Sequence, residues 1–188
     1  KTQVLEFAQK NPRFVLKPIA SGSSVGLQIV KDPAQTMAAV ESILQNNLGD
    51  YMIEAFLEGR ELTVGVLQRG PNLVALPASE VVLNEGYSFD YQGKYLGRGT
   101  TEITPARLTS LELESAQALA LKAHRDLGCG GYSRTDMILT ENGPVFLETN
   151  TLPGLSKASF IPQQLAAAEI PLADFLREQI DWGARRYD

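Results

Sequence analysis

Two short segments in the C-terminal third of the chain contain side chains that could bind a metal ion and a polyphosphate. The first, SRTD, contains Arg134 and Asp136, and the second, FLETNTLPG, contains Glu148 and Asn150. Side chains two positions apart on a strand share a face, so each pair projects together if its segment is a strand. Oxygen ligands from Asp, Glu and Asn suit Mg²⁺ or Mn²⁺ rather than zinc, particularly when phosphates complete the octahedron.

To form one site together, both pairs must lie on the same face of a hairpin. The register of the hairpin determines whether they do. The residues between the strands, TENG, allow several registers, and a one-residue slip would turn one pair away from the other. A two-residue turn at the Asn-Gly step would split the cluster. We predict a three-residue loop that ends at Gly143 in the left-handed conformation. This register pairs Asp136 with Glu148 and Arg134 with Asn150.

The predicted register also gives the hairpin an apolar face that can be buried while the polar face stays open. Four side chains are expected on that face: Met137, Leu139, Val145 and Leu147. An ordinary surface hairpin with solvated charges is the alternative that the spacing alone leaves open.

A second element near the N-terminus has the chemistry of a phosphate cradle. Lys17 ends an expected strand, and the loop SGSSVG follows it at 21–26. Glycines with flanking hydroxyls let backbone N–H groups approach an anion closely, and the lysine adds a point charge. The loop lacks the Walker pattern because no GKS or GKT ends it. A flexible Gly-Ser loop is the alternative.

The composition limits the class of protein to which the chain can belong. A chain of 188 residues, 44% hydrophobic, can bury the core of one domain or two small ones. Its net charge of −5 argues against nucleic acid as a partner. The single cysteine, Cys129, excludes an intrachain disulfide, fits a reducing cytosol and is expected to be a buried small residue. We expect no membrane span and no signal peptide, and His124 is expected to be structural. The first residue is Lys1, which suggests a fragment of a longer protein.

The order of elements is typical of an α+β fold. Strands are expected at 14–17, 27–30, 51–57, 61–68, 73–76 and 79–83, and a long functional loop at 84–99. Helices are expected from Asp32-Pro33 to Leu48, from a Ser110 cap to Leu127 with Gly128 ending it, at 161–168 and at 172–187.

Five segments in order give the chain a specific likeness: KPIASGSSVG, IEAFLEGREL, FDYQGKY, LGCGGYSRTDMIL and LETNTLPGLSKAS. With them the chain resembles the D-alanine:D-alanine ligases of the ATP-grasp superfamily. The resemblance implies an ATP-grasp fold, with residues 1–60 as part of the central lobe. Residues 61–188 would form the C-terminal catalytic domain with a mainly antiparallel sheet.

The resemblance also implies a nucleotide site. Lys17 looks like the lysine that contacts the ATP phosphates, and Ser24 lies in the loop that closes over them. Glu54 and the backbone around Leu57 would meet the adenine, and Glu61 would hold the ribose hydroxyls.

Further roles follow from the same likeness. Lys94 matches a lysine that reaches the γ-phosphate, and Tyr95 matches a tyrosine that hydrogen-bonds Ser23. Tyr95 resembles the tyrosine that the dipeptide-forming enzymes have at this place, so it favours an amine as second substrate.

In the hairpin region, three residues match ligands of two Mg²⁺ (or Mn²⁺) ions: Asp136, Glu148 and Asn150. Arg134 and the backbone N–H of Gly154 resemble the groups that stabilise the oxyanion. Ser159 lies where the family's serine binds the carboxylate of the second substrate.

The implied reaction joins two D-alanines with ATP, through an acyl phosphate, for peptidoglycan precursor synthesis. Two other readings stay open: an ATP-grasp ligase for a different amino acid, and a nucleotide-binding module that does not catalyse. The family also has an N-terminal domain that is not visible here, so we predict little dipeptide synthesis by this chain alone. The resemblance implies a cytoplasmic enzyme that is a homodimer at full length.

Overall fold

The computed structural model describes residues 2–20, 22, 25–46, 49–83 and 99–185. The chain forms two compact units, the first made of residues 1–57 and 83–101 and the second of residues 58–82 and 102–188. This division reflects how compactly the residues pack and does not test function. The functional lobes 1–60 and 61–188 therefore stay a prediction.

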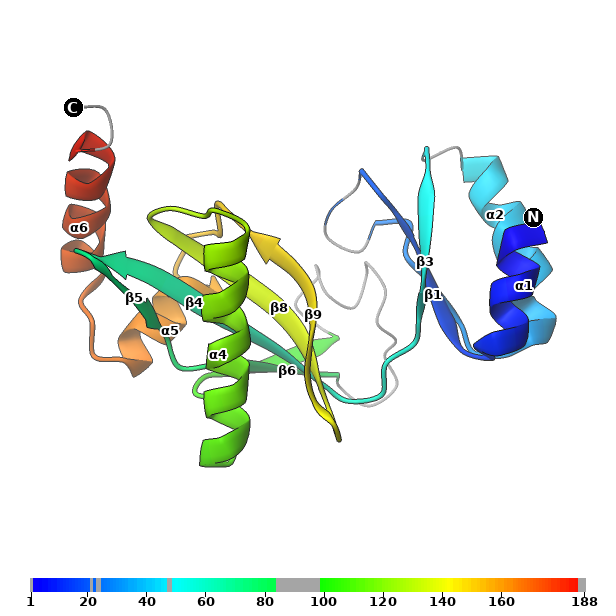
Figure 1. Cartoon of the computed structure of the whole chain (residues 1–188), viewed down its shortest axis with the longest axis horizontal. Helices are drawn as coiled ribbons and strands as arrows, with labels where there is room; N and C mark the ends of the chain where they lie inside the picture. Colours follow the sequence, from blue (N-terminus) through cyan, green and yellow to red (C-terminus); the bar gives the residue numbers. More distant parts are fainter. Residues whose placement is uncertain (1, 21, 23–24, 47–48, 84–98, 186–188) are drawn as a thin grey trace. The chain divides into compact units, whose positions relative to one another are not determined.

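The first unit is a three-stranded antiparallel sheet with helices against it (Figure 1). The strands, in the order β2-β1-β3, are β1 (Phe14–Pro18), β2 (Gln28–Val30) and β3 (Tyr51–Ala55). The helices are α1 (Thr2–Lys10), the 3-10 turn η1 (Pro33–Gln35) and α2 (Thr36–Asn46). The expected helix after Asp32 is thus confirmed in part, because a 3-10 turn capped by Asp32 precedes it. The helix α1 was not predicted.

Alternation along β1 separates a buried face from an open one. Phe14 and Leu16 are buried and pack with Ala8 of α1 and Val30 of β2. The residues between them project from the opposite face, so Lys17 lies on the side that the helices do not cover.

The second unit is built on a six-stranded sheet with the order β7-β6-β4-β8-β9, and β5 pairs with β4 beside β6. Its strands are β4 (Arg60–Arg69), β5 (Asn72–Ala75), β6 (Ser79–Leu83), β7 (Thr100–Ile103), β8 (Tyr132–Thr140) and β9 (Gly143–Asn150). Its helices are α4 (Ser110–Asp126), α5 (Phe160–Ala167) and α6 (Leu172–Arg185). The expected α+β class with mainly antiparallel pairing is confirmed. The strand β7 was not predicted.

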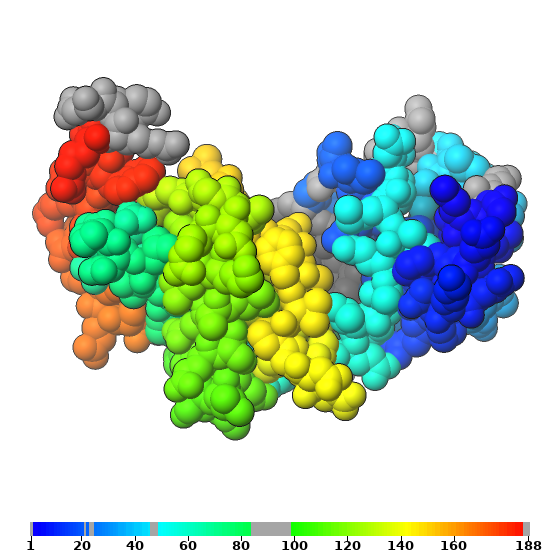
Figure 2. All heavy atoms as spheres, in the orientation of Figure 1, coloured from blue at the N-terminus to red at the C-terminus, as the bar shows by residue number. Residues whose placement is uncertain are grey.

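The two faces of this sheet carry different helices. On one face, Leu62 and Met137 pack against Ala116 and Ala120 of α4, whose small side chains let the helix approach closely. Figure 2 shows the green atoms of α4 beside the yellow atoms of β9. On the other face, α5 and α6 cover one part of the sheet through a second cluster: Leu67, Leu76, Ile161, Leu165 and Phe175. The rest of that second face carries the polar residues described below.

The helix α4 begins one residue earlier than predicted. Thr109, not Ser110, is its N-cap, and the Thr109 side chain accepts a hydrogen bond from the backbone N–H of Glu112. The Glu112 carboxylate in return accepts from the backbone N–H of Thr109, which completes a capping box. The prediction of a Ser110 cap was therefore wrong.

The β8–β9 hairpin has the predicted register at its functional end and a different one at its tip. Asp136 pairs with Glu148 and Arg134 with Asn150, as predicted. At the tip, however, Thr140 pairs with Gly143, so only two residues form the turn. A register shift between Asp136 and Met137 reconciles the two ends.

This shift corrects the predicted apolar face of the hairpin. Met137 and Leu139 are buried as expected. Val145 pairs instead with Ile138 and is 39% exposed, so it lies on the other face of the hairpin. The prediction for Val145 was wrong because the bulge changes which residues of β9 face the core.

Candidate functional site

The second unit brings the predicted metal-binding side chains to one face of its sheet. Cross-strand partners share a face, and Asp136 has Glu148 on one side and Thr63 of β4 on the other. Asn150 and Arg134 form the next pair on the same face, two residues away along each strand. We call Asp136, Glu148 and Asn150 the acid-amide cluster.

Arg134 and Asp136 form a bidentate ion pair at the centre of this face. Arg134 Nε donates to Asp136 Oδ1 at 2.8 Å and Arg134 Nη2 donates to Oδ2 at 2.8 Å. The two side chains are only 18% and 17% exposed. The hydroxyl of Thr63 donates a further hydrogen bond of 2.5 Å to Asp136 Oδ1. This geometry holds both charged groups in one arrangement.

The surroundings keep Arg134 charged. Burial on its own would lower the pKa of the guanidinium, but the hydrogen bond to Asp136 and the negative charges of Asp136, Glu148 and Glu61 raise it above its usual value. Glu61 therefore belongs to the electrostatic surroundings of the cluster. The ring of Phe160 adds a cation–π contact, 5.5 Å from the guanidinium carbon.

The donor set fits a hard divalent cation. A carboxylate offers about four lone-pair sites, so Asp136 keeps acceptor capacity on Oδ2 after its bond to Arg134. Glu148 is exposed on the same face, and Asn150 Oδ1 accepts one bond, from the backbone N–H of Leu152 at 3.1 Å. Among the described residues, no three His, Cys, Asp or Glu side chains are grouped as a metal site. An ion here would therefore need the amide, and phosphate oxygens, in addition to the two acids.

The loop after β9 brings Gly154 and Ser159 together. A Cβ added to Gly154 would lie 2.8 Å from Ser159 Oγ, so only glycine fits there without a shift. Ser159 is the N-cap of α5, yet its side chain makes no capping bond and instead lies 2.9 Å from Ser156 Oγ. The hydroxyl thus lies at the N-terminal end of a helix, where unpaired N–H groups favour an anion.

In the first unit, Lys17 and Glu54 project from the open face of the sheet and contact one another. Lys17 Nζ lies 2.6 Å from Glu54 Oε2, with side chains 25% and 44% exposed. Glu54 pairs with Val15 across β1 and β3, and Lys17 with Met52. Leu57 follows β3 and is half-buried.

The predicted site residues therefore fall into groups. The structure brings together the acid-amide cluster with Arg134 and Glu61, then Gly154 with Ser159, and Lys17 with Glu54. Four predicted residues lie outside the described part of the chain: Ser23, Ser24, Lys94 and Tyr95.

Three residues that contact or support this face were missed by the sequence analysis: Thr63, Phe160 and Gln164. Each acts across a large sequence separation, as Thr63 does on Asp136, 73 residues away. A polar residue inside an apolar strand, as Thr63 is in β4, was the only local signal available.

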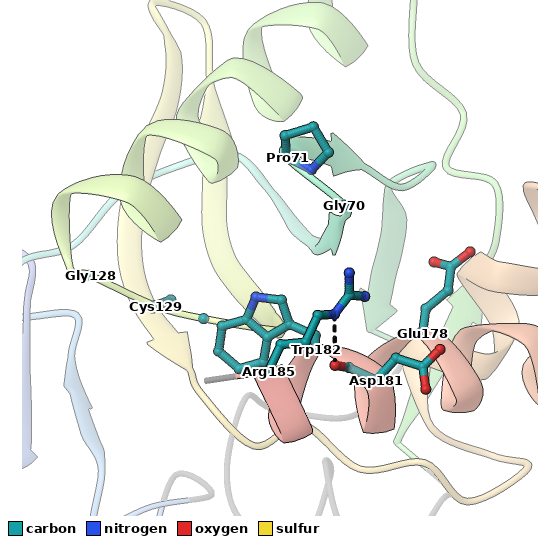
Figure 3. A pocket seen from close by; sticks show the side chains of 9 residues that line it. Gly70, Pro71, Gly128, Cys129, Glu178, Asp181, Trp182 and Arg185 are labelled. Atoms are coloured by element: carbon teal, nitrogen blue, oxygen red, sulfur yellow. Dashed lines mark hydrogen bonds between the residues drawn. The ribbon is translucent and has the colours of Figure 1, made fainter. Parts of the chain in front are cut away.

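A pocket of the second unit lies apart from these groups and shares no residue with them (Figure 3). The β4–β5 turn, the segment 128–130 that follows α4 and the helix α6 line it, and both Cys129 and Trp182 belong to the lining. Cys129 was predicted to be buried, but it is half-exposed at this pocket. Among the described helices, none is long and apolar enough to cross a membrane.

Comparisons with known proteins show which family the chain resembles. The family model described as "D-ala D-ala ligase C-terminus" matches residues 2–181. A D-alanine–D-alanine ligase from Leptospira interrogans is 42% identical over 179 residues, which cover 93% of this chain and 50% of the relative. One from Syntrophobacter fumaroxidans is 44% identical over 168 residues, covering 89% and 53%. The chain thus spans about half the length of these relatives.

Solved structures show the same fold. A D-alanine–D-alanine ligase from Bacillus anthracis matches with a TM-score of 0.78 at 29% identity, covering 96% of this chain and 57% of that one. The VanG D-Ala:D-Ser ligase from Enterococcus faecalis matches with a TM-score of 0.80 at 28% identity, covering 95% and 52%.

Proposed function

Because the chain belongs to the family of D-alanine–D-alanine ligase C-terminal regions, we propose that it supplies the metal-binding and catalytic half of an ATP-dependent ligase. The complete protein would join two D-alanines into D-alanyl-D-alanine for peptidoglycan precursor synthesis, forming ADP. The observation that carries this proposal is the pairing of Asp136 with Glu148 and of Arg134 with Asn150 on one open face. A cytoplasmic location and a homodimer at full length complete it.

The acid-amide cluster would hold Mg²⁺ or Mn²⁺, two ions in the complete enzyme. When bound, these ions neutralise the charge that spreads over the phosphoryl group during its transfer from ATP. The carboxylate of the first D-alanine receives that phosphoryl group and becomes an acyl phosphate. The amine of the second D-alanine then attacks the acyl carbon, the bond from that carbon to the phosphate oxygen breaks, and the peptide bond forms as inorganic phosphate and the amine proton leave.

Arg134 and the Gly154 N–H would stabilise the oxyanion that forms in this second step. The bidentate bond to Asp136 and the ring of Phe160 restrict Arg134, so its charge needs little reorganisation. Ser159, at the N-terminal end of α5, would bind the carboxylate of the second D-alanine. Removing one such oxyanion donor typically costs roughly a hundredfold or more in rate.

The first unit would bind part of the nucleotide. Lys17 would contact phosphate oxygens, and Glu54 and the Leu57 backbone would contact the adenine. The ribose would be held by Glu61, which belongs to β4 of the second unit. The Lys17–Glu54 ion pair supports this because it keeps both side chains on the open face of the sheet. Outside the described residues, Ser23, Ser24, Lys94 and Tyr95 keep their proposed roles at the phosphates.

The second candidate is a ligase that uses a different amino acid as second substrate. The observation that favours it is the likeness to a D-Ala:D-Ser ligase, which is as strong as the likeness to D-alanine–D-alanine ligases of known structure. Phosphate release by the complete protein, measured across a panel of D- and L-amino acids, separates the two candidates. A nucleotide-binding module without catalysis would release no phosphate with any of them.

Calorimetric titration of this chain with a non-hydrolysable ATP analogue, with and without Mn²⁺, tests the site itself. We expect Mn²⁺ to strengthen binding in the wild type, and Asp136→Ala or Glu148→Ala to remove that gain. Glu141→Ala is the matched control, because Glu141 lies exposed in the turn of the same hairpin. Loss of the Mn²⁺ effect in the control, or its persistence in both cluster variants, would refute the proposal.

A second measurement tests whether this half is sufficient. We expect this chain alone to release little phosphate in response to D-alanine, because its relatives are about twice as long. Robust D-alanine-dependent phosphate release from it would contradict that part of the proposal.

A further inference from the structure

We propose that Gln164 is a positioning residue, which fixes Thr63 in β4 so that the Thr63 hydroxyl holds Asp136 in place. This inference rests on the proposed function of Asp136 as a metal ligand. It concerns a helix residue that contacts neither the ion nor the substrates. The argument begins at a gap between two strands that pair with β4.

The strands β5 and β6 pair with different parts of β4 and leave a gap between them. β6 pairs with β4 from Glu61 to Thr63, and β5 pairs with it from Val66 to Arg69. Gly65 lies in this gap, where Leu76 donates a backbone hydrogen bond to its carbonyl at 2.8 Å. The gap is thus the place where the sheet gives β4 no continuous partner strand.

The Gln164 side chain fills this gap as a peptide group would. Its Oε1 accepts from the backbone N–H of Gly65 at 2.9 Å, and its Nε2 donates to the carbonyl of Thr63 at 2.9 Å. The N–H of one strand residue and the C=O of the residue two before it lie on the same side, so one primary amide satisfies both. Nε2 also donates to Ser79 Oγ of β6 at 3.0 Å. Gln164 is fully buried, so these bonds have no competition from water.

The position of Gln164 depends on a glycine beneath it. A Cβ at residue 65 would lie 2.7 Å from Gln164 Oε1 and 2.7 Å from Ile161 Cδ1. Such contacts are too short, so a side chain there would displace the amide from its bonds. Gly65 and Gln164 therefore depend on each other, although 99 residues separate them in the sequence.

The Gln164 side chain influences the metal-binding face through Thr63. Thr63 lies opposite Asp136, is only 3% exposed, and donates its hydroxyl hydrogen to Asp136 Oδ1 at 2.5 Å. Fixing the Thr63 carbonyl restricts the backbone that aims this hydroxyl. One turn earlier in α5, Phe160 packs over Arg134, the other partner of the ion pair. The short helix α5 thus constrains both Asp136 and Arg134.

Substitution by methionine tests this role with the least change in packing. Gln164→Met keeps the length of the side chain and removes all three hydrogen bonds. Mutation of a residue that hydrogen-bonds to a metal ligand typically changes the affinity of the site for the metal by about 10- to 100-fold. We therefore expect Mn²⁺ binding, measured by electron paramagnetic resonance with a non-hydrolysable ATP analogue present, to weaken by at least about tenfold.

Hydrogen exchange gives a readout that does not depend on the metal. We expect the Gly65 amide to exchange faster in Gln164→Met than in the wild type, because its acceptor is gone. Gln163→Met is the matched control: Gln163 is the neighbouring glutamine, and its amide donates to Glu102 at 2.7 Å at the edge of the unit. We expect Gln163→Met to leave both the Mn²⁺ affinity and the Gly65 exchange rate within about twofold of the wild type.

The outcomes separate this inference from the function on which it rests. If the wild type binds Mn²⁺ and Gln164→Met binds it equally well, the inference is wrong and the proposed function stands. If the wild type binds none, both are wrong. Should Gln164→Met not fold, Thr63→Val keeps the shape of the side chain and removes only the hydroxyl. Unchanged Mn²⁺ affinity in Thr63→Val would then overturn the inference.

Discussion

Mild acid should destabilise the second unit through its buried histidine, His124. The side chain is 1% exposed, and its Nδ1 lies 2.7 Å from Ser133 Oγ. Its Nε2 is buried with no hydrogen-bond partner among the described residues. Burial, with a smaller contribution from the charge of Arg125, lowers the pKa of the imidazole below its usual value. A proton on this ring would therefore have to be accommodated in the core.

The sign of the effect follows from linkage. The folded pKa lies below the unfolded value of about 6.5, so the unfolded chain takes up the proton first. The contribution to stability is then fully present above about pH 6.5 and is lost as the pH falls through that value. If the folded state stays neutral throughout, the loss between about pH 6.5 and 5.5 is about 1 kcal/mol. This figure is the upper bound for a single site.

Urea unfolding followed by tryptophan fluorescence measures this loss. Trp182 is the only tryptophan of the chain and lies in α6, so its signal reports on the same unit as His124. His124→Asn is the comparison, because an amide can keep the bond to Ser133 and does not titrate in this range. We expect the free energy of unfolding to fall by up to about 1 kcal/mol more in the wild type than in the variant. Parallel pH dependences of the two proteins between about pH 6.5 and 5.5 would refute the reasoning.

Three further predictions concern local contacts in the second unit, each measured as the free energy of unfolding in urea. Thr109→Ala should cost about 1 kcal/mol by removing the N-cap of α4. Ser110→Ala should change little, and an equal cost in both would contradict the assignment of the cap. Gly183→Ala should stabilise α6 by roughly 0.5–1 kcal/mol, since an added Cβ meets nothing within 4 Å. Gly65→Ala should instead destabilise by about 1–3 kcal/mol through its contact with Gln164, and a neutral effect would argue against that contact.

The sequence was sufficient for the pairing that matters most at the site. A cluster on one face required Asp136 opposite Glu148, and that requirement selected the register that the structure has. The same reasoning placed the turn wrongly, because it assumed one register along the whole hairpin. A bulge lets two registers coexist, and no local signal of it was recognised. Val145 was misplaced for this reason.

The supporting residues could not be found from local patterns. Gln164 contacts β4 from 99 to 101 residues away in sequence, and its role depends on where β5 and β6 stop pairing. Strand ends are the least reliable part of any sequence-based assignment. The helix α1 was missed although Val4, Phe7 and Ala8 have helical spacing, because so short an apolar stripe is ambiguous by itself.

The bulge in β9 divides the β8–β9 hairpin into two parts that can change independently. The extra residue there, Leu147, absorbs the mismatch between the tight tip and the cluster. Residues near the tip could therefore be exchanged, or a peptide tag inserted at Glu141-Asn142, without carrying Glu148 and Asn150 to the wrong side of the sheet. Deleting Leu147 would remove the bulge and leave a regular ladder, in which Met137 still pairs with Phe146 and Asp136 with Glu148. For anyone engineering this domain, the tip is the permissive site for insertion, and the pairing from Glu148 to Asn150 is the part of β9 that must be kept.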